Sequence, residues 1–412
     1  MHFSPRRNSL MAATLIVAAT SMALAAPAGA QATGSSGGSS QKTANTANPV
    51  DNWVTSITAG LDVTKVGNII GRQQTGDLGL VGSDLGVMAP IMDGEEFAIV
   101  FGDSFTAERL QGTWMSPVGV VATMGADGTI TIERPLNSGT QVRQLISYTH
   151  TNMLTFLPSD IINIDGVLYM QGSWNRGIGN VDSTQIFASY DNGQTWHNAG
   201  RTSKSYMDGM GDLLSWERGP DGYIYVMSTR FQRNDPVYLS RFRPAEIGDR
   251  TKWQLYDPAS RSWGSTASPV IYTNVEAGEM SLRYIDGYWV LVLFNEKTMA
   301  IEVRAARSIT ADWDSIIPAN VVIAGTGGWG AVQTASNFTQ LYGGFIVPGS
   351  TLSNMNILVS QWNTGDNSVY TTTQFNVKGL EKYFGMTPQL ERAGQPSLEV
   401  TETVMEQITL GE

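Results

Sequence analysis

From residue 78 onward the chain repeats one pattern: a short apolar run, a turn that contains glycine, and a second run rich in aromatic and β-branched residues. The turns are Asp93-Gly94, Asp165-Gly166, Asp221-Gly222, Asp286-Gly287 and Gly343-Gly344. Asp-Gly and Gly-Gly between such runs are strong signals for β-hairpins. The pattern therefore predicts five hairpins, and no long amphipathic helix interrupts them.

The hairpins recur about every 60 residues, and most are followed by another strand-like run, which makes about four strands per unit. Five such units predict an all-β, five-bladed β-propeller. A β-sandwich would explain the hairpins but not their recurrence at blade-length intervals. In a propeller the innermost strands line a central channel, and we expect these strands at 83–90, 160–164, 212–217, 280–285 and 333–341.

The segment Ser189-Tyr190-Asp191-Asn192-Gly193-Gln194-Thr195-Trp196 resembles the Asp-box that recurs in propellers such as sialidases. Its aspartate caps turn amides and its glycine takes a left-handed conformation. Such boxes lie at the periphery, so we interpret Asp191, and with it His197, as structural.

The pattern divides the chain into four parts. Residues 1–30 carry Arg6 and Arg7, an alanine-rich apolar stretch and an A-x-A-like cleavage site, which predict a signal peptide. Residues 31–50 are a Ser/Gly-rich linker, 51–380 the propeller, and 381–412 an acidic tail that either packs on the propeller or extends from it. We expect a secreted or cell-wall-associated protein that does not insert into the membrane after cleavage.

Charge and cysteine content narrow the class of partner. The net charge of −11 argues against nucleic acid as a partner. There is no cysteine, so the core alone must stabilise an exported protein.

His150 precedes the second unit and is interpreted as a structural hydrogen-bonding residue. With few histidines no zinc site is expected, and no cofactor; bound calcium stays open, because such sites leave weak sequence traces.

The candidate chemistry lies in the first unit. Asp84 in G-S-D-L-G and Asp103 in F-G-D-S-F each stand beside glycine at the end of an apolar run. Two carboxylates on neighbouring strands are what glycosidic hydrolysis requires: one acid, and one base or nucleophile. Further acidic residues at the predicted strand entrances are Asp160, Asp212 and Glu279, and Glu279 is the third candidate.

Sugar rings also bind to flat aromatic side chains. Four tryptophans fall in predicted loops or strand ends, and we expect one or two of them in the cleft: Trp114, Trp174, Trp263 and Trp329. Two further motif matches are not interpreted as functional sites. The G-x-S-x-G of residues 34–38 lies in the linker, and the G-x-G-x-x-G of residues 325–330 is not followed by a helix.

The first-unit motifs, together with W-M-S-P-V-G-V, G-S-W-N-R and L-V-S-Q-W-N, resemble glycoside hydrolase family 183 over roughly residues 65–380. The resemblance implies a five-bladed propeller acting as an endo-D-arabinanase on internal α-linkages of arabinogalactan and lipoarabinomannan. It places the catalytic pair at Asp84 and Asp103, with Asp84 favoured as base, Asp103 as acid and inversion as outcome. Expected substrate-binding residues are Glu279, Trp114, Trp174, Asn175 and Trp329.

Two other readings stay open. One is a furanosidase of different specificity, either exo-acting or specific for L-arabinan, because loop conformations decide between endo and exo action. The other is a non-catalytic propeller that binds cell-wall glycan. In each case the partner is a cell-wall polysaccharide, D-arabinan under the family resemblance, and the protein is expected to be a monomer.

Overall fold

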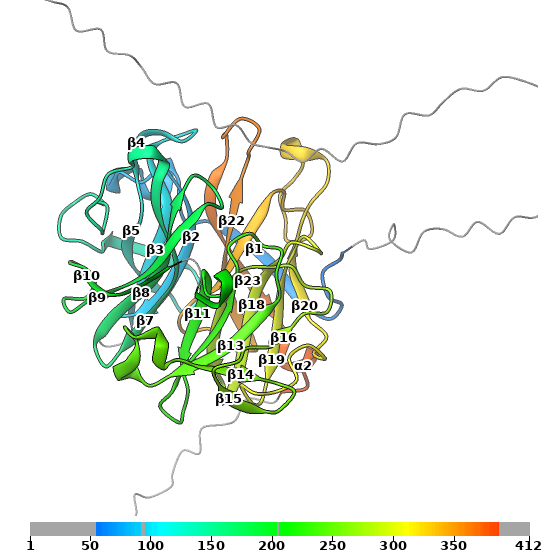
Figure 1. Ribbon diagram of the computed structural model, residues 1–412. Coiled ribbons are helices and arrows are strands. Elements are labelled where there is room, and N and C mark those ends of the chain that lie inside the picture. Colours follow the sequence, from blue (N-terminus) through cyan, green and yellow to red (C-terminus); the bar gives the residue numbers. More distant parts are fainter. Residues whose placement is uncertain (1–54, 92–94, 204–205, 387–412) are drawn as a thin grey trace, which may run out of the picture. The chain divides into compact units, whose positions relative to one another are not determined.

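The structure is a computed structural model that describes residues 55–91, 95–203 and 206–386, all within the second of two compact units, 54–412. The predicted signal peptide and linker, the Asp93-Gly94 turn and the tail beyond Met386 lie outside the described residues. The described strands form five antiparallel sheets, the five blades of a β-propeller (Figure 1). The predicted fold class is confirmed.

Each blade is a meander that starts at the centre. Blade one contains β2 (Gly82–Pro90), β3 (Glu96–Ala107), β5 (Val118–Met124) and β6 (Ile130–Pro135), and β4 (Gln111–Met115) pairs with β3. Blade two contains β7 (Leu154–Ile164), β8 (Val167–Arg176), β9 (Val181–Ser189) and β10 (His197–Ser203). Blade three contains β11 (Leu213–Arg218), β12 (Ile224–Thr229), β13 (Val237–Phe242), β14 (Gln254–Asp257), β15 (Ser262–Gly264) and β16 (Pro269–Ile271).

The last two blades complete the ring. Blade four contains β17 (Ala277–Ile285), β18 (Tyr288–Asn295), β19 (Ala300–Ala306) and β20 (Ala319–Ile323). Blade five contains β21 (Leu341–Ile346), β22 (Asn354–Trp362), β23 (Tyr370–Lys378) and, at its outer edge, β1 (Asp62–Asn68). Because β1 comes from the N-terminal side and pairs with β23, the first strand of the described residues closes the last blade.

The helices are short. They are α1 (Arg72–Thr75), α2 (Leu380–Tyr383) and the 3₁₀ turns η1 (Gly76–Leu78), η2 (Thr151–Met153), η3 (Tyr206–Gly209), η4 (Pro244–Glu246), η5 (Arg250–Lys252) and η6 (Gly328–Gly330). Among the described residues, none has the length and apolar character needed to cross a membrane.

Burial explains the sequence pattern. Middle strands are covered by neighbouring blades on both faces, so β18 is buried at every position and reads as a continuous apolar run. The outermost strand β1 alternates between exposed and partly buried positions, because only one of its faces meets the protein. The core therefore lies between the blades as well as within them.

Of the four predicted turns that fall within the described residues, three join paired strands and one does not. Asp165-Gly166 and Asp286-Gly287 have positive φ angles at both residues, as a type I′ hairpin turn requires. Gly343-Gly344 is instead a bulge inside β21, opposite β22. The expectation of a hairpin turn there was wrong, and so was the innermost strand at 333–341, because the β21–β22 connection follows Ile346. The other four innermost-strand segments lie in or directly beside β2, β7, β11 and β17.

The Asp-box joins β9 to β10 and is structural, as expected. The Asp191 carboxylate accepts hydrogen bonds from the Ser189 hydroxyl and from the amide and hydroxyl of Thr195. A Cβ on Gly193 would come within 2.7 Å of the Leu136 side chain, and φ there is +89°, so glycine is required. The turn therefore packs against the connection that leaves blade one.

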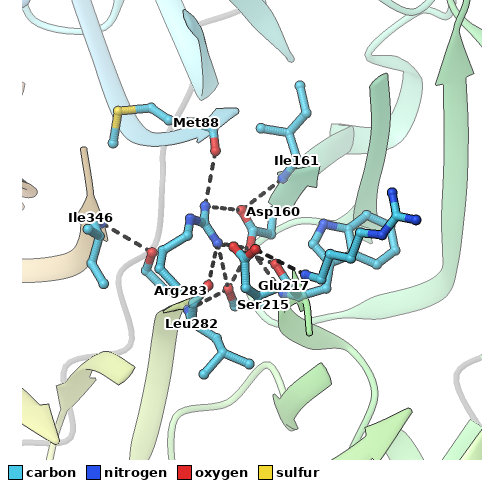
Figure 2. A network of polar contacts seen from close by, with 11 residues as sticks. Met88, Asp160, Ile161, Ser215, Glu217, Leu282, Arg283 and Ile346 are labelled. Carbon is cyan, nitrogen blue, oxygen red and sulfur yellow. Dashed lines mark hydrogen bonds and ion pairs between the residues drawn. The ribbon is translucent and has the colours of Figure 1, made fainter. Parts of the chain in front are cut away.

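A buried polar cluster connects the innermost strands of neighbouring blades (Figure 2). Arg283 on β17 forms two hydrogen bonds of 3.0 Å to the two oxygens of Asp160 on β7, and a third to the carbonyl oxygen of Met88 on β2. The Ser215 hydroxyl on β11 also donates to Asp160. Blade five joins through the amide of Ile346, which donates to Ser281 on β17. These contacts between the innermost strands of the five blades are together called the central plug.

Candidate active site

The central plug separates two cavities at opposite ends of the channel. The larger, of about 670 Å³, is lined by the C-terminal ends of the innermost strands, including Pro90, Glu217 and Tyr284. The smaller, of about 540 Å³, is lined by their N-terminal halves and contains Asp84 and Asp103. We assign the candidate site to the smaller cavity, because two buried carboxyl groups with raised pKa values lie there within an aromatic wall.

A β-bulge brings the two carboxylates together. Ser83 pairs with Ser104 and Leu85 pairs with Phe101, so one residue of β2, Asp84, lies opposite two residues of β3. Leu85 is held at φ +61°, a conformation that costs a branched side chain free energy. Side chains of blade five bind its backbone: the Ser360 hydroxyl accepts from the Leu85 amide, and the Thr372 hydroxyl donates to its carbonyl.

Glycine in F-G-D-S-F has a steric reason. A Cβ on Gly102 would lie 2.6 Å from Oδ1 of Asp84 and 2.9 Å from the Leu85 side chain. The next residue but one, Ser104, is buried and shares a 2.7 Å hydrogen bond with Ser83 across the two strands. The two sequence motifs of blade one therefore describe a single bulge that carries the carboxylates.

Asp84 carries the more strongly perturbed carboxyl group of the pair. Burial raises the pKa of Asp84 to about 7, and the negative charges of Asp103 and Glu279 add to the rise. Tyr342 donates a 2.9 Å hydrogen bond to Oδ2, and this donor and Tyr370 only partly offset the increase. Oδ1 is enclosed and has no hydrogen-bond partner. A proton is therefore readily held on Asp84 near neutral pH.

Asp103 is better stabilised as an anion. Its Oδ1 accepts hydrogen bonds from the indole N–H of Trp114 at 2.8 Å and from the hydroxyl of Thr155 at 2.7 Å. Burial still raises the pKa of Asp103, but the two donors and the nearby His150 ring act against the rise. Asp84 also has hydrogen-bond donors, but the negative charges of Asp103 and Glu279 act against its ionisation, whereas the nearby His150 ring favours the anion of Asp103.

A third carboxylate lies on the opposite wall. Glu279 on β17 lines the cavity, and its Oε1 accepts a hydrogen bond from Arg233, whose guanidinium lies 5.0 Å over the ring of Tyr342. Its Oε2 is buried and has no hydrogen-bond partner. Apolar and aromatic side chains complete the wall, among them Phe105, Phe231, Phe294, Trp362 and Tyr370.

The other expected site residues do not line the cavity. Trp114 lies behind Asp103 as its hydrogen-bond donor, outside the cavity lining. Trp174 and Asn175 are buried in β8, where the Trp174 indole donates to Gln185 and Asn175 donates to Ser173. They pack the interior, and neither lines the cavity, so their expected contact with substrate stays a prediction without support from this geometry. Trp329 lies in η6, and the cavity lining does not include it.

The remaining candidates have other places. Asp160 belongs to the central plug. Asp212 lines a recess of about 280 Å³ with Arg230, where burial raises the pKa of Asp212 to about 7. Trp263 packs against Tyr225 and Tyr256 in blade three.

Sequence reasoning missed the residues that complete the site from distant blades. Tyr342 and Tyr370 contact Asp84 from blade five, and Arg233 pairs with Glu279 from the loop after β12. Their local sequences show aromatic strand residues and a loop arginine, which have no distinguishing pattern. Among the described residues, no group of three or more acidic, histidine or cysteine side chains is arranged to hold a metal ion.

Comparisons with known proteins agree with this fold. The chain is 27% identical over 328 residues to the "Uncharacterized 35.9 kDa protein in asd 3'region" of Mycolicibacterium smegmatis, covering 75% of this chain and 96% of the relative. A putative hydrolase from Bacteroides ovatus superposes with a TM-score of 0.56 at 14% identity, covering 85% of this chain and all of the other.

A second solved structure, the exo-beta-1,3-galactanase from Phanerochaete chrysosporium with beta-1,3-galactotriose, superposes with a TM-score of 0.50 at 10% identity, covering 81% of this chain and 67% of the other. Identities this low show the shared fold alone. The family described as "Domain of unknown function (DUF4185)" matches residues 71–376, which is most of the chain. The chain therefore belongs to the DUF4185 domain family.

Proposed function

We propose that the protein is a glycoside hydrolase, an endo-D-arabinanase that cleaves internal α-D-arabinofuranosyl linkages. The observation that carries the proposal is the coupled pair Asp84 and Asp103 in an aromatic-walled cavity. Two carboxyl groups with different proton affinities supply the acid and the base that glycosidic hydrolysis needs. The resemblance of both motifs to glycoside hydrolase family 183 supports D-arabinan as the substrate.

The surroundings of the two groups favour Asp84 as the acid and Asp103 as the base, the reverse of the roles favoured by the family resemblance. Asp84 lies beside two other carboxylates and retains a proton near neutral pH. Asp103 has two donors on one oxygen, which favours the anion. In this assignment Asp103 takes a proton from water, the water oxygen bonds to the anomeric carbon, and Asp84 protonates the departing oxygen. The outcome is inversion.

Cavity shape supports internal cleavage. The cavity and the recess beside Asp212 share Gly179 and Gln232 as lining residues, so the two hollows meet along this edge. In this proposal sugar units on either side of the cleaved bond occupy the cavity and the neighbouring recess. An exo-acting enzyme would need a closed end instead.

Product analysis tests the function. The full chain is incubated with purified D-arabinan, L-arabinan and galactan, and the products are separated by length over time. We expect a ladder of oligosaccharides from D-arabinan alone. Free arabinose as the only product would favour an exo-acting enzyme, and cleavage of L-arabinan would change the assigned substrate. Retention of glycan without cleavage would favour the binding propeller.

Rescue kinetics test the two roles. Asp84→Asn is expected to lose activity on polysaccharide but to retain most activity on an aryl arabinofuranoside, whose leaving group needs no proton. Asp103→Gly is expected to regain activity with azide, which replaces the activated water and yields an arabinosyl azide of inverted configuration. The opposite pattern in the two variants would restore the roles expected from the family resemblance.

A further inference from the structure

His150 lies directly behind the catalytic pair, in the connection between β6 and β7. Its ring stacks on the indole of Trp114 with 3.8 Å between ring centroids and 18° between planes. The same indole donates its N–H to Asp103. Trp114 is thus a flat bridge with the imidazole on its face and the carboxylate at its edge.

Both ring nitrogens of His150 face oxygen acceptors. Nδ1 lies 2.9 Å from the carbonyl oxygen of Leu154, and Nε2 lies 3.0 Å from Oε1 of Gln144. A carbonyl oxygen only accepts hydrogen bonds, so Nδ1 must carry a proton. The protonation of Nε2 depends on which way the Gln144 amide points.

Backbone groups fix that amide. Its Nε2 donates to the carbonyl oxygens of Ile146 and Tyr148 at 2.7 and 3.1 Å, and its Oε1 accepts from the amide of Ser116 at 3.3 Å. A flipped amide would set oxygen against two carbonyls and N–H against N–H. Gln144 therefore presents oxygen to His150, and Nε2 of the ring must also carry a proton.

The charges around the ring point in the same direction. Burial lowers the pKa of His150, whereas the carbonyls of Leu154 and Trp114 and the carboxylate of Asp103 favour the charged ring. Tyr148, 5.0 Å away, stays neutral, because burial raises its pKa to about 12. A neutral imidazole would leave one nitrogen lone pair facing an oxygen lone pair at hydrogen-bonding distance. Burial is the larger effect and lowers the pKa of His150, but the acceptor at each ring nitrogen favours the doubly protonated ring on hydrogen-bond geometry.

We propose that His150 is an imidazolium that, through the stacked indole of Trp114, holds Asp103 in place and keeps it ionised. A cation on the face of an indole is attracted to it and draws electron density from the ring, which strengthens the N–H as a donor. His150 does not line the cavity, so it is a positioning residue. Its role in catalysis rests on the proposed function, but its protonation state does not.

Nitrogen NMR of the full chain tests the protonation state. The sequence contains three histidines, so selective ¹⁵N-histidine labelling gives three sets of ring signals, assigned with His150→Phe and His197→Phe. We expect protons on both His150 nitrogens at pH 7, because each faces an oxygen acceptor. A ring with one proton at pH 7 would overturn the proposal.

The coupling has its own test. In Asp103→Asn the His150 midpoint is expected to fall by about one pH unit, because the carboxylate no longer favours the charged ring. An unchanged midpoint would show that the two groups are independent. Neither NMR result depends on activity, so the proposal fails separately from the assigned hydrolase function.

Kinetics give the functional readout. His150→Phe keeps an aromatic ring against Trp114 but removes the charge, and we expect the acidic limb of kcat/KM to move up by about one pH unit. His197→Phe, the matched control beside the Asp-box, is expected to leave the profile unchanged. An acidic limb that stays in place in His150→Phe would contradict the role on Asp103.

Discussion

At the scale of single residues, the site depends on one unusual backbone feature. The bulge in blade one holds Leu85 at positive φ and sets Asp84 opposite Gly102 and Asp103. Strained backbone of this kind persists only where the surroundings hold it, here through Ser360 and Thr372. The carboxylates are thus placed by backbone geometry before any substrate arrives.

Gly102→Ala tests the steric part of this arrangement. The new Cβ would lie 2.6 Å from Oδ1 of Asp84, so the carboxylate must move. A displacement of about 1 Å at a reacting group costs on the order of 100-fold in rate, and we expect that loss in kcat/KM. Gly264→Ala is the control, because its Cβ would meet nothing within 4 Å. Equal activity of the two variants would refute the packing argument.

Asp84→Asn is expected to stabilise the fold at high pH. Because the folded-state pKa of Asp84 is raised to about 7, its ionisation destabilises the folded protein as pH rises from about 4 to 7. The amide has no such cost, so the variant gains up to about 4 kcal/mol at pH 8 and nothing below pH 4. Urea unfolding at both pH values measures the difference. A stability gain independent of pH would contradict the raised pKa.

At the scale of elements, the central plug joins the innermost strands of all five blades. Its ion pair between Arg283 and Asp160 is buried, with the Asp160 side chain 1% exposed. Breaking such a pair from one side leaves an uncompensated charge in the interior. The plug therefore stabilises the ring by linking its innermost strands.

Arg283→Met is expected to lower the free energy of unfolding by about 3–5 kcal/mol, because Asp160 then stays buried without its cation. The control is Arg218→Met, whose partner Asp165 is largely exposed at the opposite mouth, and we expect less than about 1 kcal/mol there. Adding Asp160→Asn to Arg283→Met should recover part of the loss. Similar losses in both single variants would contradict the role of the plug.

Local patterns predicted the blades, because hairpin turns and strand periodicity are encoded within a few residues. Asp165-Gly166 became a type I′ turn for this reason. The Gly343-Gly344 bulge shows the limit of prediction from local patterns. A Gly-Gly pair is typical of a hairpin turn, but here it lies inside a strand because close packing requires glycine. A Cβ on Gly344 would lie 3.0 Å from Ile301 of blade four. Contacts between blades are not visible in local sequence.

The same limit applies to the site. Asp84 and Asp103 were found because both belong to one hairpin. Tyr342 joins them from a position 258 residues further along the chain, so only the closed ring brings it to Asp84. Trp174 was expected in the cleft because a tryptophan at a strand end can either bind sugar or pack against other side chains. In the structure it is buried and packs against Phe156.

At the scale of the whole molecule, the candidate site lies at one end of the ring. The ring is closed in blade five, where the N-terminal strand β1 pairs with β23. Strand β1 completes blade five, whose Ser360, Tyr342 and Tyr370 support the bulge of blade one. Site geometry thus depends on closure of the ring. This dependence explains why the proposed catalytic pair, encoded in blade one, needs the full propeller.

The most direct test of the central claim is the initial rate of new reducing ends from purified D-arabinan. It compares the wild type with Asp84→Asn, Asp103→Asn and the exposed loop variant Asp312→Asn, after circular dichroism has shown that each is folded. We predict a loss of about 10³-fold or more in both site variants, since each supplies an acid or base, and none in Asp312→Asn. Wild-type rates in either site variant would contradict a catalytic pair at Asp84 and Asp103.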